Sequence, residues 1–161
     1  MTYFDALLFV LLTTPEYWLE RPDDTREPRM AQVAAALQAY APEVAAAAIV
    51  QGQAESGFAR YVAEGCRVIP RGAPSCDRGK ARGYWQQWRA QCPGAYAYES
   101  GSPESLRAEV ACVARRWRWH LSGAGRVAGF PPGRWALYRA TLARLRSLHS
   151  GQSQRPPTST R

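Results

Sequence analysis

The sequence contains almost no lysine. Lys80 is its one lysine, so arginine supplies nearly all of the formal charge of +8. A basic surface suggests a polyanionic partner such as nucleic acid, an anionic membrane or the acidic polymers of a cell wall. Much of the basic excess follows Arg107, where it is scattered along two predicted helices and forms no single tract. No recognised nucleic-acid-binding motif accompanies it, so we expect no nucleic-acid partner.

The sequence also lacks a long hydrophobic run. Its longest apolar stretch, Ala6 to Leu12, is far shorter than a bilayer span, so we expect no stable membrane insertion. The first residues, Met1 to Asp5, carry an acid where a secretory signal carries positive charge, and no small-residue cleavage site follows. If the protein acts outside the cytoplasm, we expect a route other than an ordinary leader.

Cysteine is sparse and shows no metal-site spacing. Cys66, Cys76, Cys92 and Cys112 are separated by ten, sixteen and twenty positions, without the C-x-x-C pairs typical of zinc sites, so we expect no metal. An even number is consistent with two disulfides in an oxidising compartment. Of the three pairings, we favour Cys66 with Cys76 and Cys92 with Cys112, because each closes a local loop. The alternative is four free buried thiols.

A chain of 161 residues with 46% hydrophobic residues is expected to form one domain with its own core. Residues 1–28 read as an apolar helix and a charged linker that pack on this domain. The domain itself is expected to span residues 29–149. Residues 150–161 are rich in Ser, Thr, Pro and Gln and are predicted to be a disordered tail.

Apolar spacing predicts a mainly α fold of about five helices. Helices are expected over residues 29–40, from Pro42 to the turn that carries Glu55, from Ser102 to about 123, and after Pro131-Pro132. Leu106, Val110, Val113, Trp117 and Leu121 step by four, three, four and four, which is typical of an amphipathic helix. At most a small β-hairpin is expected beside them, with residues 61–63 and 67–69 as weak strands.

Glu55 ends the almost wholly apolar helix that starts at Pro42. Val44, Ala48, Gln51 and Glu55 share one helix face, so we expect Glu55 to point toward the core. A carboxyl group that loses its hydration keeps a proton available near neutral pH, as a general acid requires. The competing interpretation is a surface glutamate in the last helical turn.

Two further blocks carry a family resemblance. Glu55-Ser56-Gly57-Phe58, followed by Gly83-Tyr84-Trp85-Gln86 with Asp77-Arg78-Gly79 before it, resembles the goose-type lysozymes and lytic transglycosylases. A later block, Gly123 to Val127, is similar to the family's Gly-Ala-Gly-x-Val segment, whereas the Tyr-Asn pair that precedes it in the family is missing. The resemblance covers roughly residues 29–148 and implies a lysozyme-like α+β fold.

The resemblance implies a peptidoglycan-cleaving muramidase that needs no cofactor. Glu55 would be the catalytic acid, and Asp77 would hold the attacking water if the enzyme is a hydrolase. Trp88 stands where a second family aspartate is expected. A lytic transglycosylase needs no water nucleophile, so one carboxylate suffices for it. Glu64 is a further candidate carboxylate, although a solvated loop charge explains it better.

Several residues are expected to line a sugar site by the same resemblance. Ser56 and Gly83 belong to the motifs, and Gln86 would bind substrate or position its loop. Tyr84, Trp85 and Trp88 offer aromatic faces for sugars, with core packing as the alternative. His120 or Tyr138 is the candidate to replace the missing tyrosine, whereas a structural role is the better interpretation of His120.

These expectations define one leading hypothesis and two rivals. The partner is expected to be the glycan strand of peptidoglycan. The protein is expected to act on it as a monomer outside the cytoplasm, in the periplasm, in the cell wall or in association with a phage. The first rival is a lysozyme-like domain that binds glycan or a partner without cutting it. The second is a basic helical nucleic-acid-binding protein.

Overall fold

The structure is a computed structural model, and it describes residues 1–15, 25–73, 76, 80–122 and 132–150. The described chain is mainly helical, as the sequence predicts. Its order is α1 (Tyr3–Leu12), α2 (Arg26–Leu37), α3 (Pro42–Ser56), α4 (Arg60–Ala63), β1 (Ala81–Arg82), β2 (Gln87–Trp88), the 3-10 helix η2 (Pro93–Ala97), α5 (Pro103–Leu121) and α6 (Pro132–Ser150). The predicted tail from residue 151 lies outside the described residues, as do residues 16–24 of the predicted N-terminal segment.

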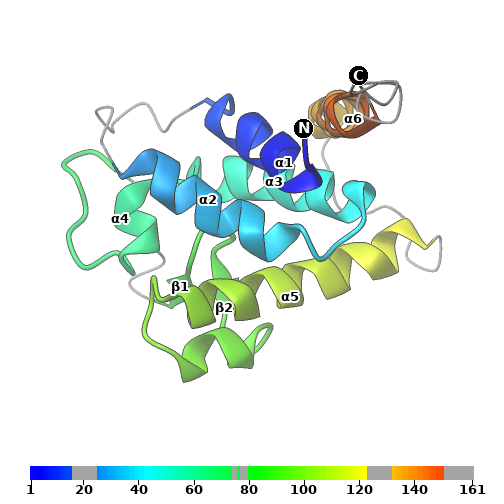
Figure 1. Cartoon of the computed structure of the whole chain (residues 1–161). Helices are drawn as coiled ribbons and strands as arrows, with labels where there is room; N and C mark the ends of the chain where they lie inside the picture. The colour runs from blue at the N-terminus through cyan, green and yellow to red at the C-terminus, as the bar shows by residue number, and fades with distance from the viewer. Residues whose placement is uncertain (16–24, 74–75, 77–79, 123–131, 151–161) are drawn as a thin grey trace, which may run out of the picture.

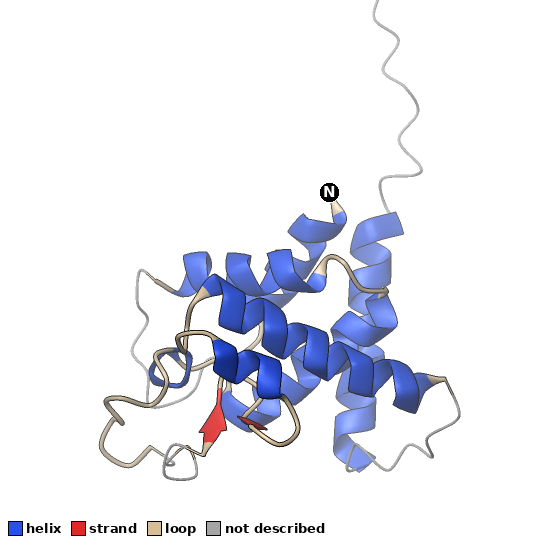
Figure 2. Cartoon of the chain, turned by 90° about the horizontal axis from the view of Figure 1, so that it is seen from below, coloured by secondary structure: helices blue, strands red, loops and turns tan. Residues whose placement is uncertain are grey.

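Helix α3 lies at the centre of the arrangement. It contacts α5 on one side and α6 on another, while α1 packs on both α2 and α6 (Figure 1). Alanine dominates α3, and the small side chains at Ala45 to Ala48 are fully buried, which lets neighbouring helices approach closely. Figure 2 shows the two short strands at one edge of this helical body.

The helix ends follow local sequence signals. Pro42 occupies the first turn of α3, and Gly57 ends the helix in the left-handed conformation. Ser102 caps α5, because its hydroxyl accepts a hydrogen bond from the Ser105 amide. Helix α2 begins at Arg26, three residues before the predicted start, because Pro28 falls in the first turn, where a missing amide hydrogen costs nothing.

The predicted location of the hairpin is wrong. Residues 60–63 form the short helix α4, which buries Tyr61 and Val62 side by side, and residues 67–69 form no strand. The antiparallel pair is instead β1 with β2, in the register Ala81 to Trp88 and Arg82 to Gln87. The residues between these strands are the Gly83–Gln86 loop, so the hairpin presents that motif.

One apolar core joins the main helices and this loop. It includes Leu7 and Leu11 of α1, Met30 of α2, Ile49 of α3, and Trp85 of the loop, all at most 1% exposed. Burying side chains of this size stabilises the fold by roughly 1.5–3 kcal/mol each. A smaller cluster around Tyr61, Val62 and Cys76 lies outside it and holds the chain that follows α4.

Candidate functional site

The end of α3 carries Glu55 on the surface. The expectation that this glutamate points into the core is wrong, because its side chain is exposed. Gln51, one turn earlier on the same face, accepts a hydrogen bond of 2.8 Å from the indole nitrogen of Trp117. The predicted face is therefore buried at Val44 and Ala48 but reaches solvent at its last turn.

The turn after Glu55 packs against the Gly83–Gln86 loop. The ring of Phe58 lies 5.3 Å from Tyr84 and 6.0 Å from Trp85, both edge to face. The Trp85 indole nitrogen also donates to the Ala48 carbonyl oxygen at 2.7 Å. A side chain on Gly52 would collide with the Phe58 ring, so glycine is needed there. Two motifs that are distant in sequence thus form one unit in space.

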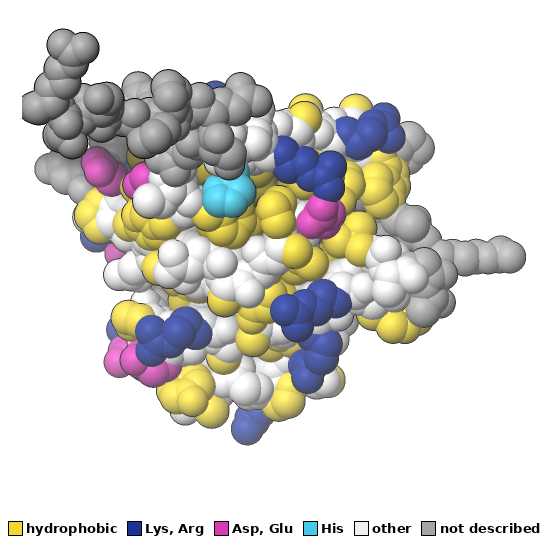
Figure 3. Space-filling model, turned by 45° about the vertical axis from the view of Figure 1, so that its right-hand side comes forward, with side chains coloured by type: hydrophobic (Ala, Val, Ile, Leu, Met, Phe, Trp, Pro, Cys, Tyr) yellow, Lys and Arg dark blue, Asp and Glu magenta, His cyan; other side chains and the backbone are white. Residues whose placement is uncertain are grey.

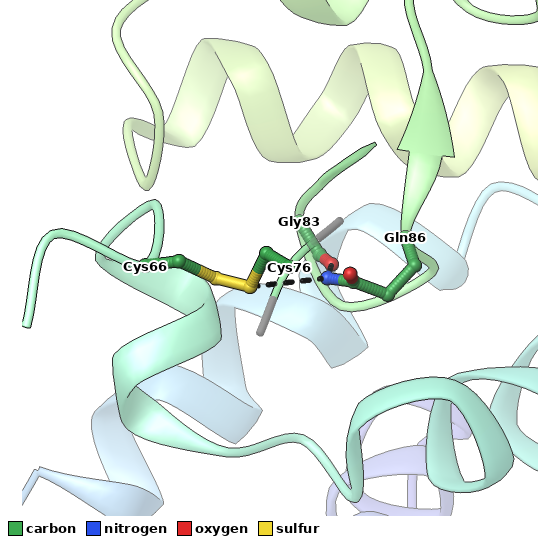
Figure 4. The surroundings of a disulfide bond; sticks show 4 residues. All are labelled: Cys66, Cys76, Gly83 and Gln86. Carbon is green, nitrogen blue, oxygen red and sulfur yellow. Dashed lines mark hydrogen bonds between the residues drawn. A yellow bond between two sulfur atoms is a disulfide. The ribbon is translucent and has the colours of Figure 1, made fainter. Parts of the chain in front are cut away.

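Gln86 holds the loop rather than projecting into an open site. Its amide nitrogen donates to the Gly83 carbonyl oxygen at 3.0 Å and lies 3.8 Å from the Cys76 sulfur (Figure 4). Its backbone takes a positive φ of 46°. Cys76 is joined to Cys66 by a disulfide, which confirms the first predicted pair. The disulfide therefore links the chain after α4 to the motif loop.

Gly83 lies against a buried carboxyl group that sequence reasoning missed. Glu109 of α5 is 2% exposed, and its carboxylate fills the space that a Cβ on Gly83 would occupy. Burial raises the pKa of Glu109 to about 7, although a hydrogen bond from Ser105, the Tyr84 amide and the charge of Arg82 each oppose the rise. Glu109 follows Leu106 by three positions, and that place on an apolar stripe is the signal that could have identified it.

The remaining motif residues are mostly buried. Ser56 is 5% exposed; its hydroxyl donates to the Gly52 carbonyl and accepts from the Phe58 amide, so it serves the helix end. Tyr84 and Trp85, at 4% and 1% exposed, are core residues and present no open sugar-stacking face. Trp88 differs from both, because 46% of it is exposed. Its ring is therefore an exposed aromatic surface two positions after the motif loop.

His120 and Tyr138 occupy different places. His120 ends α5 with its ring 5.5 Å from Trp117 and 4.9 Å from Trp119. Through Trp117 it is connected to Gln51, one turn from Glu55. Tyr138 is 7% exposed, and burial, followed by the charge of Glu43, raises its pKa. Glu43 lies in the first turn of α3, whereas Glu55 lies in its last turn. The carboxylate that acts on Tyr138 is therefore Glu43 and not the candidate catalytic acid.

Two candidate carboxylates complete the predicted set. Asp77 lies outside the described residues, as does the segment from Gly123 to Val127. Glu64 is exposed and pairs with Arg60 at 2.6 Å, one helical turn away. The structure therefore presents Glu64 as a solvated, paired charge, in agreement with its interpretation as a loop charge and not as a catalytic carboxylate.

The second predicted disulfide is not formed. Cys92 and Cys112 are free thiols, and each points its sulfur at a backbone carbonyl: Ala108 at 3.7 Å for Cys92, and Gln91 at 3.2 Å for Cys112. The two thiols lie close together. Burial is the larger cause that raises the pKa of Cys92 to about 12, and a hydrogen bond with the Cys112 side chain is the second.

The surface charge is dispersed on the face that Figure 3 draws. On the face drawn in Figure 3, Lys and Arg side chains are separated by apolar and uncharged groups and do not gather in one patch. Within the described residues, no three His, Cys, Asp or Glu side chains are grouped so that they could hold a metal ion. Nor is any helix in the described part of the chain both long and apolar enough to cross a bilayer.

Comparison with known proteins returned no relative: the chain matches no protein-family profile, no curated protein and no solved structure.

Proposed function

We propose that this protein cleaves the β-1,4 bond between N-acetylmuramic acid and N-acetylglucosamine in peptidoglycan, by lytic transglycosylation with Glu55 as the general acid and then the general base. The observation that carries the proposal is the packing of the Glu55 turn against the Gly83–Gln86 loop, through Phe58 with Tyr84 and Trp85. The motif resemblance pairs the same two blocks in one sugar site.

Exposure of Glu55 is compatible with this role. A glycan strand that covers the end of α3 would remove water from the carboxyl group only when substrate is bound. The exposed ring of Trp88, two positions after Gln86, offers a stacking face for a sugar in the same region of the chain. The arginine-rich surface would draw the protein toward an anionic wall.

The reaction balances without water. Glu55 gives its proton to the glycosidic oxygen as the bond between that oxygen and C1 of the muramic acid residue breaks, through an oxocarbenium-like transition state. The C6 hydroxyl oxygen of the same residue then bonds to C1, and its proton goes to the Glu55 carboxylate. The products are a 1,6-anhydro end and a free 4-hydroxyl, and Glu55 is protonated again.

A goose-type hydrolase is the alternative for the same bond. In that case Asp77 would hold the water that attacks C1. A binding domain without activity is the other alternative, and the exposure of Glu55 is the observation that favours it.

The test for catalysis is clearing of purified peptidoglycan by the wild type, Glu55→Gln and Glu27→Gln. Glu27 is an exposed carboxylate in the first turn of α2, so it controls for loss of a surface charge. We expect Glu55→Gln to abolish clearing and Glu27→Gln to retain it. Equal clearing by all three proteins would falsify the assignment of Glu55, and no clearing by the wild type would favour the binding domain.

Mass spectrometry of the released fragments separates the two chemistries. Anhydro ends support transglycosylation, whereas reducing ends indicate hydrolysis. Asp77→Asn provides a second criterion, because it should leave a transglycosylase active and inactivate a hydrolase.

A further inference from the structure

A cavity of about 300 Å³ lies behind the motif loop, and Glu55 is not among its lining residues. Arg29 and Gln32 of α2, Glu64 and Arg67 near α4, Ser100 before α5, and Glu109 of α5 contribute its polar lining. Gly83 and Tyr84 also line it, and Tyr84 belongs to the apolar core as well. Its volume is at the lower end of the range for small-molecule sites.

The Glu109 carboxyl group accepts hydrogen bonds from Ser105 and from the Tyr84 amide. Two buried polar atoms of residues that line this cavity nevertheless have no hydrogen-bond partner among the described residues. They are Oε2 of Glu109 and the hydroxyl oxygen of Ser100. A buried polar atom that makes no hydrogen bond costs about 1–3 kcal/mol. Two such atoms on the walls of one cavity therefore point to an occupant that supplies the missing bonds.

The charges around the cavity indicate the chemistry of that occupant. The buried end holds the Glu109 carboxyl group, for which an ammonium group is the best-matched donor, because it also compensates the buried charge. Two guanidinium groups also line the cavity and suit a carboxylate: Arg67, and Arg29, which donates to the Phe58 carbonyl oxygen at 3.0 Å and to the Thr25 hydroxyl at 3.1 Å. The one further carboxylate among the lining residues, Glu64, is paired with Arg60. Arg67 is 69% exposed and pairs with Glu99 on the surface, so it can exchange that partner at little cost.

We propose that this cavity binds a zwitterionic amino-acid group, with its ammonium on Glu109 and Ser100 and its carboxylate on Arg29 and Arg67. A free amino acid and the peptide stem of peptidoglycan both present this group. The proposal does not depend on catalysis by Glu55, since it rests on the cavity alone. A neutral sugar fits the cavity less well, because it would leave a buried carboxylate uncompensated.

The first test is titration of the full chain with meso-diaminopimelic acid, followed by calorimetry. The controls are the same compound acetylated on both amines, and cadaverine, which keeps the amines but has no carboxylates. We expect each control to bind at least about tenfold more weakly, because each loses a charge-assisted contact. Equal binding of the acetylated compound, or no saturable binding of any probe, would overturn the proposal and leave the cavity to water.

The second test uses variants. Glu109→Gln is expected to weaken binding at least about tenfold. Because Glu109 also supports Gly83, Arg67→Ala and Ser100→Ala provide tests that leave the core intact. Arg115→Ala, an exposed arginine on α5 that does not line this cavity, is the matched control. The proposal fails if Arg67→Ala and Arg115→Ala bind diaminopimelic acid equally well.

A third experiment identifies which molecule supplies the zwitterionic group. The soluble tripeptide L-alanyl-D-glutamyl-diaminopimelic acid is compared with free diaminopimelic acid. Tighter binding of the tripeptide assigns the cavity to the peptide stem, and tighter binding of the free compound assigns it to a free amino acid. Because binding and not cleavage is measured, the result is independent of the test of Glu55.

Discussion

The carboxyl group of Glu109 fills the space beside Gly83 that any side chain at position 83 would need. Gly83 also has a φ of 69°, in the left-handed region that favours glycine. One buried acid thus determines which residue can stand at the start of the motif loop. The relationship joins Glu109 of α5 to a glycine that precedes it by more than twenty positions in the sequence.

Gly83→Ala is therefore expected to lower the free energy of unfolding by roughly 2–4 kcal/mol, through backbone strain and the collision with Glu109. In the Glu109→Ala background the collision disappears and only the strain remains, so the penalty should fall by about half. Urea unfolding of both single variants and the double variant measures this coupling. Strictly additive effects would show that the two residues do not interact.

Stability should also depend on pH through Glu109. Its pKa is about 7 in the folded protein, above the value of 4.5 for an unperturbed carboxyl group. Between these values the folded state holds the proton and the unfolded state does not, so the free energy of unfolding falls as pH rises from 4.5 to 7. The loss is on the order of 3 kcal/mol and is complete above pH 7.

Glu109→Gln tests this linkage, because a glutamine cannot release the proton. The charged and titratable groups that act with Glu109 are Arg82, Tyr96 and Cys92. Burial raises the pKa of Tyr96 and of Cys92 above ordinary values that already lie above pH 7. Chemical unfolding at half-unit steps should give a falling curve for the wild type and a flatter one for the variant. Parallel curves would assign the pH dependence to other groups.

The helices could be predicted from sequence because their signals are local. The spacing of Leu106, Val110, Val113 and Trp117 identified α5, and Ser102 identified its cap. The hairpin could not be located, since Tyr61 and Val62 suit a strand by composition but are buried in a single helical turn. Whether Glu55 reaches solvent depends on how neighbouring helices end, which helical periodicity does not determine.

The candidate site, like the fold, could be predicted from the sequence only where local signals determine it. The pairing of Cys66 with Cys76 followed from a short loop and is confirmed, whereas Cys92 and Cys112 are neighbours without a bond. Ser100 could not be identified in advance, because its role arises from a loop that brings it to the cavity. Tertiary contacts of this kind leave no periodic pattern in the sequence.

The two free thiols should react at very different rates. Cys92 is 2% exposed with a pKa raised to about 12, so almost none of it is thiolate near neutral pH, whereas Cys112 is partly exposed. Iodoacetamide should modify one thiol per native chain and two in denaturant. Cys112→Ser should abolish the native reaction, and Cys92→Ser should leave it unchanged. Labelling of Cys92 in the native chain would contradict its burial.

Trp88 should contribute to binding of insoluble peptidoglycan without stabilising the fold. Its ring is 46% exposed, and Tyr98, at 47%, is an aromatic control with nearly equal exposure. A stacked sugar is expected to gain about 1 kcal/mol from such a ring, by analogy with aromatic pairs. Trp88→Ala should therefore lower retention in a pelleting assay about fivefold, while Tyr98→Ala changes it little and both keep the unfolding midpoint. If both variants lose retention equally, general surface hydrophobicity accounts for binding and Trp88 has no specific role.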